Sequence, residues 1–274
     1  MTGEGRISPD AMTTCLSALT RLRFLSIAFL QQTSSPYRTD QRPAPPAHTI
    51  LPALTYLTLE GPHGYLEDLV GRFDASLVNS GRLAFHDRPT YGTPKVPQFI
   101  YRTKMFKSLG KVEMSFSPER VHASFCPLIG PANVFLSFPC SGLPAQLTLM
   151  ERISAQWPPL FSPVEALRLY VFPEEKRWWE VIAPWLEFLR LFAAVWTLDL
   201  HWEGTVSHVA HILGELEGER AAEVLPSLRT IEFISSELVA SESMHLLEPF
   251  LFARDESEHP VEVYADIIED LDTE

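Results

Sequence analysis

The sequence predicts an α/β solenoid, in which a curved parallel sheet lies inside and helices and loops lie outside. An apolar pattern recurs about every thirty residues along the 274-residue chain. Each copy ends in an apolar alternation typical of a short strand, and several intervals between copies have apolar residues at helical spacing. Units of this length bury their apolar sides only by stacking on their neighbours. We therefore expect about eight or nine stacked repeats.

Five segments share one apolar spacing, in which two leading positions precede an alternating pair. In LTRLRFLSI these positions are Leu19, Leu22, Leu25 and Ile27. The same spacing is present in LPALTYLTL, FKSLGKVEM, FAAVWTLDL and LPSLRTIEF. The alternating pair places both side chains on one face of a strand. The length of the unit is at the long end of the range for leucine-rich repeats, roughly 20–29 residues.

Weaker copies predict four further strands. They retain the alternating pair, at Leu83 and Phe85, Leu136 and Phe138, Leu167 and Leu169, and Val261 and Val263. The copy within SLVNSGRLAF is stretched by about two residues relative to the others. An all-helical repeat array has similar leucine spacing, but prolines shortly before several strands, such as Pro52, Pro163 and Pro226, favour extended backbone.

The segments between the strands predict helices, a hairpin and a loop. Residues 64–73 and 206–216 have apolar side chains at helical spacing. Residues 112–116 and 121–125 flank a Ser-Pro-Glu-Arg turn and predict a hairpin, within a Pro-rich and irregular portion at 82–144. The polar, Pro-rich segment 33–48 predicts a long surface loop. We assign residues 1–254 to the solenoid and 255–274 to a last strand with an acidic tail.

Charge and cysteine content exclude several classes of partner. The formal net charge is −13, and residues 255–274 contain nine acidic residues and no lysine or arginine. Binding to nucleic acid or to anionic membranes requires clustered positive charge, so neither is expected. The acidic tail is either a solvated end or a docking site for a basic partner. The three separated cysteines, the absence of a signal-peptide pattern and the interrupted apolar stretch 181–200 predict a soluble protein of the cytoplasm or nucleus.

No pattern specific for catalysis is present, so we predict no catalytic residue, no metal and no cofactor. Phosphate-binding, dinucleotide-binding, nucleophile-elbow and HExxH motifs are absent. The best metal candidate is His208 with His211, near His201 and Glu203. No cysteine lies near them and a fourth ligand is unclear, so we interpret these histidines as solvent-facing residues of a repeat helix.

The repeats resemble the leucine-rich-repeat region of fungal, basidiomycete F-box-like proteins. The resemblance is carried by many weak matches from about Ala11 to Val263, among them LPALTYLTLEG, GYLEDLVGRFDA, PWLEFLRLFAAVWTLDL and GERAAEVLPSLRTIEF. It implies a substrate-recognition subunit of a ubiquitin ligase, whose F-box would bind a Skp-type adaptor. The repeats begin by about Leu19, which leaves too little chain before them for an F-box. A Skp-type adaptor is therefore expected only if an F-box is encoded upstream.

We expect a non-enzymatic, monomeric protein that binds a protein partner of unknown identity. The inner sheet would present polar residues that flank the apolar strand positions. Trp178 and Trp179 are adjacent, so one of them should be exposed. The predicted binding residues are Thr58, Glu60, Arg168, Tyr170, Trp178, Trp179, Asp199, His201 and Glu232. The alternatives are a truncated, free-standing structural domain without a ligase role and, less in keeping with the sequence, an enzyme.

Overall fold

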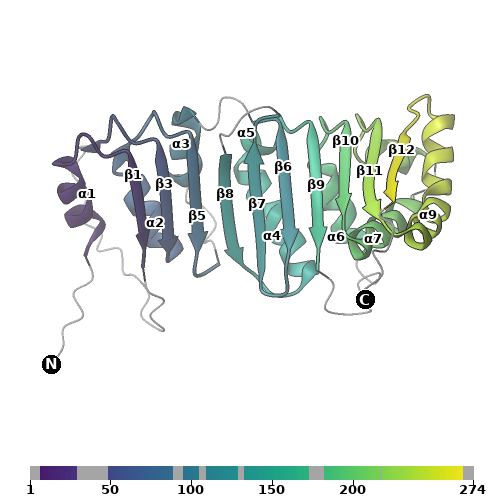
Figure 1. The fold of residues 1–274 in the computed structure, drawn as a ribbon, viewed down its shortest axis with the longest axis horizontal. Coiled ribbons are helices and arrows are strands. Elements are labelled where there is room, and N and C mark those ends of the chain that lie inside the picture. The colour runs from purple at the N-terminus through teal and green to yellow at the C-terminus, as the bar shows by residue number, and fades with distance from the viewer. Residues whose placement is uncertain are drawn as a thin grey trace, which may run out of the picture. The chain divides into compact units, whose positions relative to one another are not determined.

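The computed structural model describes residues 7–29, 49–88, 95–104, 109–128, 133–172, 182–216 and 218–267. The architecture is α/β, and the chain forms two compact units. Unit 1 comprises Met1–Ser108 and Ile129–Pro139, and unit 2 comprises Leu109–Leu128 and Cys140–Glu274. The strands are mostly parallel in both units, and the sheets are not closed into barrels (Figure 1). The predicted α/β class with a parallel sheet is confirmed, whereas the solenoid arrangement stays a prediction.

Unit 1 contains a four-stranded parallel sheet in the order β1-β3-β5-β8. A separate pair of short parallel strands, β2 and β4, flanks helix α2 in sequence. The elements of unit 1 are α1 (Pro9–Ser17), β1 (Phe24–Ala28), β2 (Thr49–Ile50), β3 (Tyr56–Gly61), α2 (His63–Val70), β4 (Phe73–Asp74), β5 (Ser80–Phe85), α3 (Lys95–Arg102) and β8 (Asn133–Pro139).

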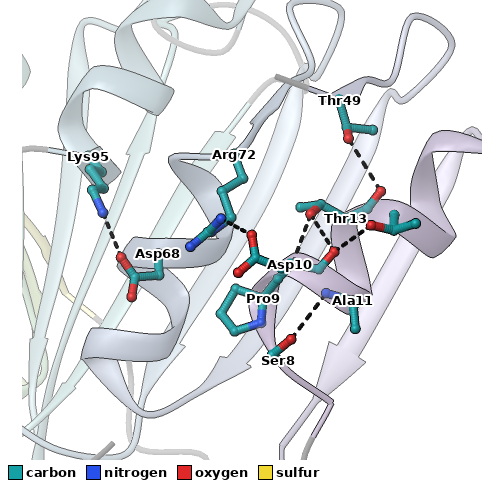
Figure 2. Close-up of polar contacts among 10 residues, drawn as sticks. Ser8, Pro9, Asp10, Ala11, Thr13, Thr49, Asp68, Arg72 and Lys95 are labelled. Atoms are coloured by element: carbon teal, nitrogen blue, oxygen red, sulfur yellow. Dashed lines mark hydrogen bonds and ion pairs between the residues drawn. The ribbon is translucent and has the colours of Figure 1, made fainter. Parts of the chain in front are cut away.

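Polar contacts hold the first helices of unit 1 in place (Figure 2). The side-chain oxygen of Ser8 accepts a hydrogen bond from the Ala11 amide and caps α1, which begins at a proline. Asp10 forms an ion pair with Arg72, which follows α2. Lys95, at the start of α3, lies 2.6 Å from Asp68 of α2. These contacts link the three helices to one another.

A buried carboxylate caps helix α3 from outside the helix. The carboxylate of Glu67 accepts hydrogen bonds from the backbone amides of Lys95, at 3.0 Å, and Val96, at 3.2 Å. Its side chain is 2% exposed. The first amides of a helix have no partner within the helix, so a carboxylate at this position satisfies them and complements the helix dipole.

Unit 2 contains six strands in the order β7-β6-β9-β10-β11-β12. All neighbouring strands are parallel except β6 and β7, which form an antiparallel hairpin. The elements are β6 (Lys111–Phe116), β7 (Arg120–Cys126), α4 (Leu143–Gln156), α5 (Pro158–Phe161), β9 (Ala166–Val171), α6 (Ile182–Arg190), β10 (Thr197–His201), α7 (Glu203–Gly214), α8 (Glu219–Glu223), β11 (Thr230–Ser235), α9 (Glu237–Glu256) and β12 (Glu262–Ile267).

The register of the parallel strands confirms most of the predicted alternating pairs. In unit 2, Val112 pairs with Leu167, Leu167 with Leu198, and Leu198 with Ile231. All four side chains have no exposed surface. The predicted hairpin is also confirmed, because Val112 pairs with Phe125 and Phe116 with Val121 across β6 and β7. The strands at these positions exclude the all-helical alternative for the described copies.

Three predicted pairs are wrong by two residues. Leu57 pairs with Gly81 rather than with Leu83, so the equivalent pair in β5 is Gly81 and Leu83. This displacement matches the stretch of two residues seen in that copy. In the last strand Ile231 pairs with Val263, so the pair is Val263 and Ala265 instead of Val261 and Val263. In β8 Gly81 pairs with Val134, so the pair is Val134 and Leu136 instead of Leu136 and Phe138. In β5 and β12 a small residue occupies a position where the apolar spacing predicts a larger one.

The predicted helices are present with shifted bounds. The segment 64–73 forms α2 only as far as Val70, and Phe73 begins the short strand β4. The segment 206–216 lies largely within α7, which already begins at Glu203 and ends at Gly214. The predicted surface loop at 33–48 lies outside the described residues.

Candidate functional site

One face of the unit 2 sheet carries polar and aromatic side chains, which we call the outward face. Helix α7 packs against β9, β10 and β11 on the opposite face, and α4, α6 and α7 lie behind the strands in Figure 1. Successive strand residues alternate between the two faces. The outward face is formed by Lys111, Glu113, Ser115, Ala166, Arg168, Tyr170, Thr197, Asp199, His201, Thr230, Glu232, Ile234, Glu262, Tyr264 and Asp266.

An ionic row crosses the middle of the outward face. The parallel register places Arg168 between Glu113 of β6 and Asp199 of β10. The Arg168 guanidinium lies 2.5 Å from the Asp199 carboxylate and 3.3 Å from that of Glu113. Burial acts to lower the pKa of Arg168, but the hydrogen bond and the negative charge of Asp199 outweigh it and raise this pKa. The guanidinium is therefore firmly charged and fixed in orientation.

Asp199 orients a second partner on the same face. Its other carboxylate oxygen lies 2.9 Å from Nε2 of His201, two residues further along β10. The aspartate side chain is only 12% exposed, so its two partners shield it from water. A buried carboxylate is tolerated when its oxygens are paired in this way. His201 and Arg168 are therefore held by the same aspartate.

An aromatic cluster adjoins His201 through the ring of Tyr170. The Tyr170 ring lies 5.1 Å from the His201 ring and 6.4 Å from the Trp202 ring, measured between centroids. Trp202 also packs edge-on against Phe172, at 4.1 Å. Its indole is 51% exposed, and its backbone φ is 77°. A positive φ is strained for a bulky residue and is common at functional sites, where the surrounding contacts maintain it.

The last two strands add an acidic end to the outward face. Glu232 of β11 pairs in register with Tyr264 of β12. The Tyr264 hydroxyl donates a hydrogen bond to Glu262 at 2.5 Å, and this bond, together with the charges of Glu262 and Glu232, raises the pKa of Tyr264. Tyr264 and Trp202 were not among the residues predicted from the sequence. The repeat spacing could have identified Tyr264, because it is the β12 residue in register with Arg168, Asp199 and Glu232 of the preceding strands.

The predicted binding residues fall into two groups, one in each unit. Arg168, Tyr170, Asp199, His201 and Glu232 all lie on the outward face of unit 2, as expected. Thr58 and Glu60 lie on β3 of unit 1. Thr58 pairs with Ser26 and Arg82, and Glu60 lies 3.3 Å from His86. Trp178 and Trp179 lie outside the described residues.

The interpretation of the α7 histidines as solvent-facing is wrong for His208. Its side chain has no exposed surface, and Nδ1 lies 3.2 Å from the carbonyl oxygen of Gly204. Burial lowers the pKa of His208 to about 3. Within the described residues, no group of three or more His, Cys, Asp or Glu side chains is arranged to hold a metal ion.

The cysteines are free, as predicted from their spacing. Cys15 is exposed, Cys126 is half-buried and Cys140 is buried. Burial is the main cause that raises the pKa of Cys126, which opposes formation of a reactive thiolate. Among the helices in the described parts of the chain, none is long and apolar enough to span a membrane.

Comparisons with protein-family models, with curated proteins and with solved structures each find no match to this chain.

Proposed function

We propose that the chain is a non-enzymatic protein-binding domain that contacts its partner through the outward face of unit 2. The observation that carries this proposal is the cluster of Arg168, Asp199, His201, Tyr170 and Trp202, which is fixed by short ionic contacts and ring packing. Tyr, Trp and Arg are the side chains that most often dominate the energy of protein interfaces. Side chains already fixed in the free protein lose little conformational entropy on binding.

In the finer form of the proposal, the strand–helix units stack as a leucine-rich-repeat solenoid, and the domain is the substrate-recognition part of an F-box-like ubiquitin-ligase receptor. The repeat spacing and the sequence resemblance support this form. A Skp-type adaptor belongs to it only if the gene encodes an F-box upstream of the repeats. A free-standing structural domain without a ligase role is the alternative.

Affinity purification with matched tryptophan variants tests the binding surface. Trp202→Ala removes an exposed ring from the cluster. Trp196→Ala is the control, because the Trp196 ring is exposed to a similar degree but lies outside the cluster and donates a hydrogen bond to Glu165. We expect a partner that the wild type and Trp196→Ala capture and that Trp202→Ala and Tyr170→Ala lose. With purified partner, calorimetry should show at least tenfold weaker binding for the two cluster variants. Equal capture by all four proteins would overturn the outward-face proposal.

A further inference from the structure

Strand β12 is an open edge of the unit 2 sheet. It is the last strand in the order and pairs in parallel with β11. Within the described part of the chain, no strand pairs with its other side. Helix α9 contacts β12, yet five of the six residues of the strand are exposed, and Val263 is half-exposed. Natural proteins usually cover or interrupt such an edge, because it is a template for an added strand.

The backbone groups that face the open edge can be assigned. The Glu262 amide donates to the carbonyl oxygen of Arg229, at 2.9 Å, on the β11 side. In a parallel strand, both backbone groups of one residue point to the same side, and the side alternates along the chain. Tyr264 and Asp266 therefore also bond to β11, whereas Val263, Ala265 and Ile267 direct their amides and carbonyls toward the open edge.

The two faces of β12 differ in chemistry. Its inner-facing residues Val263, Ala265 and Ile267 continue the core rows, and their partners Ile231, Phe233 and Ser235 on β11 are buried. Ile267 is nevertheless 54% exposed, so the core rows end without a covering strand. The outer-facing residues are Glu262, Tyr264 and Asp266, with Glu232 in the adjacent row. No described lysine, arginine or histidine forms an ion pair with any of these three carboxylates.

The apolar inner face and the acidic outer face of β12 determine which kind of added strand fits the open edge. A second copy of β12 is a poor fit, because an antiparallel pair centred on Tyr264 places Glu262 opposite Asp266, and like charges directly across a strand pair are destabilising. A strand that alternates aliphatic with basic residues extends the inner apolar rows and places positive charge beside the carboxylates. Such strand addition is an established mode of peptide recognition.

We propose that β12 is a strand-addition site for an extended segment of a basic partner protein, in which lysine or arginine residues alternate with aliphatic residues. This inference rests on the edge of the sheet, and it stands apart from the proposed role of the Tyr170 and Trp202 cluster. The acidic surplus of the whole chain, with a formal net charge of −13, favours the encounter with such a partner.

Fluorescence anisotropy with a labelled synthetic peptide of alternating lysine and valine tests the proposal on the full chain. The control peptide has the same composition with its lysines in one block, so it has the same charge but no alternation. We expect saturable binding of the alternating peptide and at least tenfold weaker binding of the block peptide. Amide hydrogen exchange of Val263, Ala265 and Ile267 should slow when the alternating peptide is bound.

Three variants distinguish strand addition from simple charge attraction and from self-association. Ala265→Pro removes one edge-facing amide and no amide bonded to β11, and proline is tolerated on edge strands in this orientation. Ala265→Pro should weaken binding of the alternating peptide at least tenfold. The surface double variant Glu262→Lys with Asp266→Lys should weaken it to the same extent, whereas Tyr170→Ala should bind the peptide as the wild type does. Undiminished binding by folded Ala265→Pro would indicate charge attraction alone and overturn the proposal. A concentration-dependent dimer, disrupted by Ala265→Pro in sedimentation, would instead identify the occupant as a second copy and overturn the basic partner.

Discussion

Arg254 is the largest buried charge in the described chain, and its hydrogen bonds explain why it is tolerated. The side chain has no exposed surface. Its guanidinium donates to the backbone carbonyls of His259, at 3.1 Å, and Leu228, at 2.8 Å, with longer bonds of 3.4 Å to Ala221 and Pro226. The carbonyl of Ala221 lies within α8, those of Pro226 and Leu228 precede β11, and that of His259 follows α9, so one side chain connects three elements. Burial lowers the pKa of Arg254 without removing its charge at neutral pH.

Replacement of this guanidinium by an ammonium group should destabilise unit 2. In Arg254→Lys the charge remains, but the fork geometry that reaches four carbonyls is lost. We expect the free energy of unfolding to fall by about 2–4 kcal/mol, because buried carbonyls lose charge-assisted hydrogen bonds. Urea denaturation measures the change. The control, Arg229→Lys at an exposed position, should differ from the wild type by less than about 0.5 kcal/mol.

His208 should make stability depend on pH in a defined range. Its pKa is about 3 in the folded protein, chiefly because burial disfavours the charged form, against a usual value of 6.5. The unfolded chain therefore binds the proton first as the pH falls. The contribution of neutral His208 to stability is fully present above pH 6.5 and is lost progressively toward pH 3, by on the order of 5 kcal/mol over the whole range.

The slope of stability against pH, rather than stability itself, tests this assignment. His208→Leu removes the titrating group, so the free energy of unfolding should fall less steeply between about pH 6.5 and pH 4.5 than in the wild type. An unchanged slope in His208→Leu would contradict the assignment.

At the scale of elements, α7 and α9 pack together through a glycine. A methyl group added at Gly214 would overlap the backbone carbonyl oxygen of Leu246 in α9. This oxygen cannot move aside as a flexible side chain can, so the two helices would have to separate. Gly64 of α2 offers a contrast, because a methyl group there meets nothing within 4 Å.

The two glycines therefore predict different effects of the same substitution on stability. Gly214→Ala should lower the free energy of unfolding by about 1–3 kcal/mol, because it overpacks the α7–α9 interface. Gly64→Ala should leave stability unchanged or raise it by up to about 1 kcal/mol through helix propensity. Urea denaturation of both variants provides the comparison. Equal effects at the two sites would contradict the close approach of α7 and α9.

The strands could be predicted from the sequence where large apolar residues alternate. Their register could not be predicted where small residues interrupt this alternation. Leu167, Leu198 and Ile231 are large and buried, so their spacing identified β9, β10 and β11 correctly. Gly81 lies in the core row of Leu57 and Ala265 in the core row of Phe233, but neither side chain is large enough to give a clear apolar signal, so the predicted pairs in β5 and β12 are shifted. Hydrophobic spacing reflects side-chain size, whereas backbone hydrogen bonds set the register.

At the scale of the whole molecule, the outward face could be predicted in part because it follows from strand alternation. Arg168, Asp199 and Glu232 were placed on one face correctly, since each flanks a buried strand residue. The contacts between them could not be predicted, because they depend on neighbouring strands that are distant in sequence. The same limit applies to the buried state of His208, where helical spacing does not distinguish a polar side chain on the core side from one in solvent.

Net charge is a further property of the whole molecule that leads to a prediction. With a formal net charge of −13, repulsion among carboxylates destabilises the compact state at low ionic strength. An increase in salt from about 0.01 M to 0.1 M shortens the screening length from about 30 Å to 10 Å. We expect the midpoint of thermal unfolding at pH 7 to rise by a few degrees over this range, because isolated surface ion pairs lose only tenths of a kcal/mol on screening. The double variant Glu262→Gln with Asp266→Asn should show a smaller rise. A midpoint that falls as salt is added would mean that ion pairs such as Arg168–Asp199 outweigh the net repulsion.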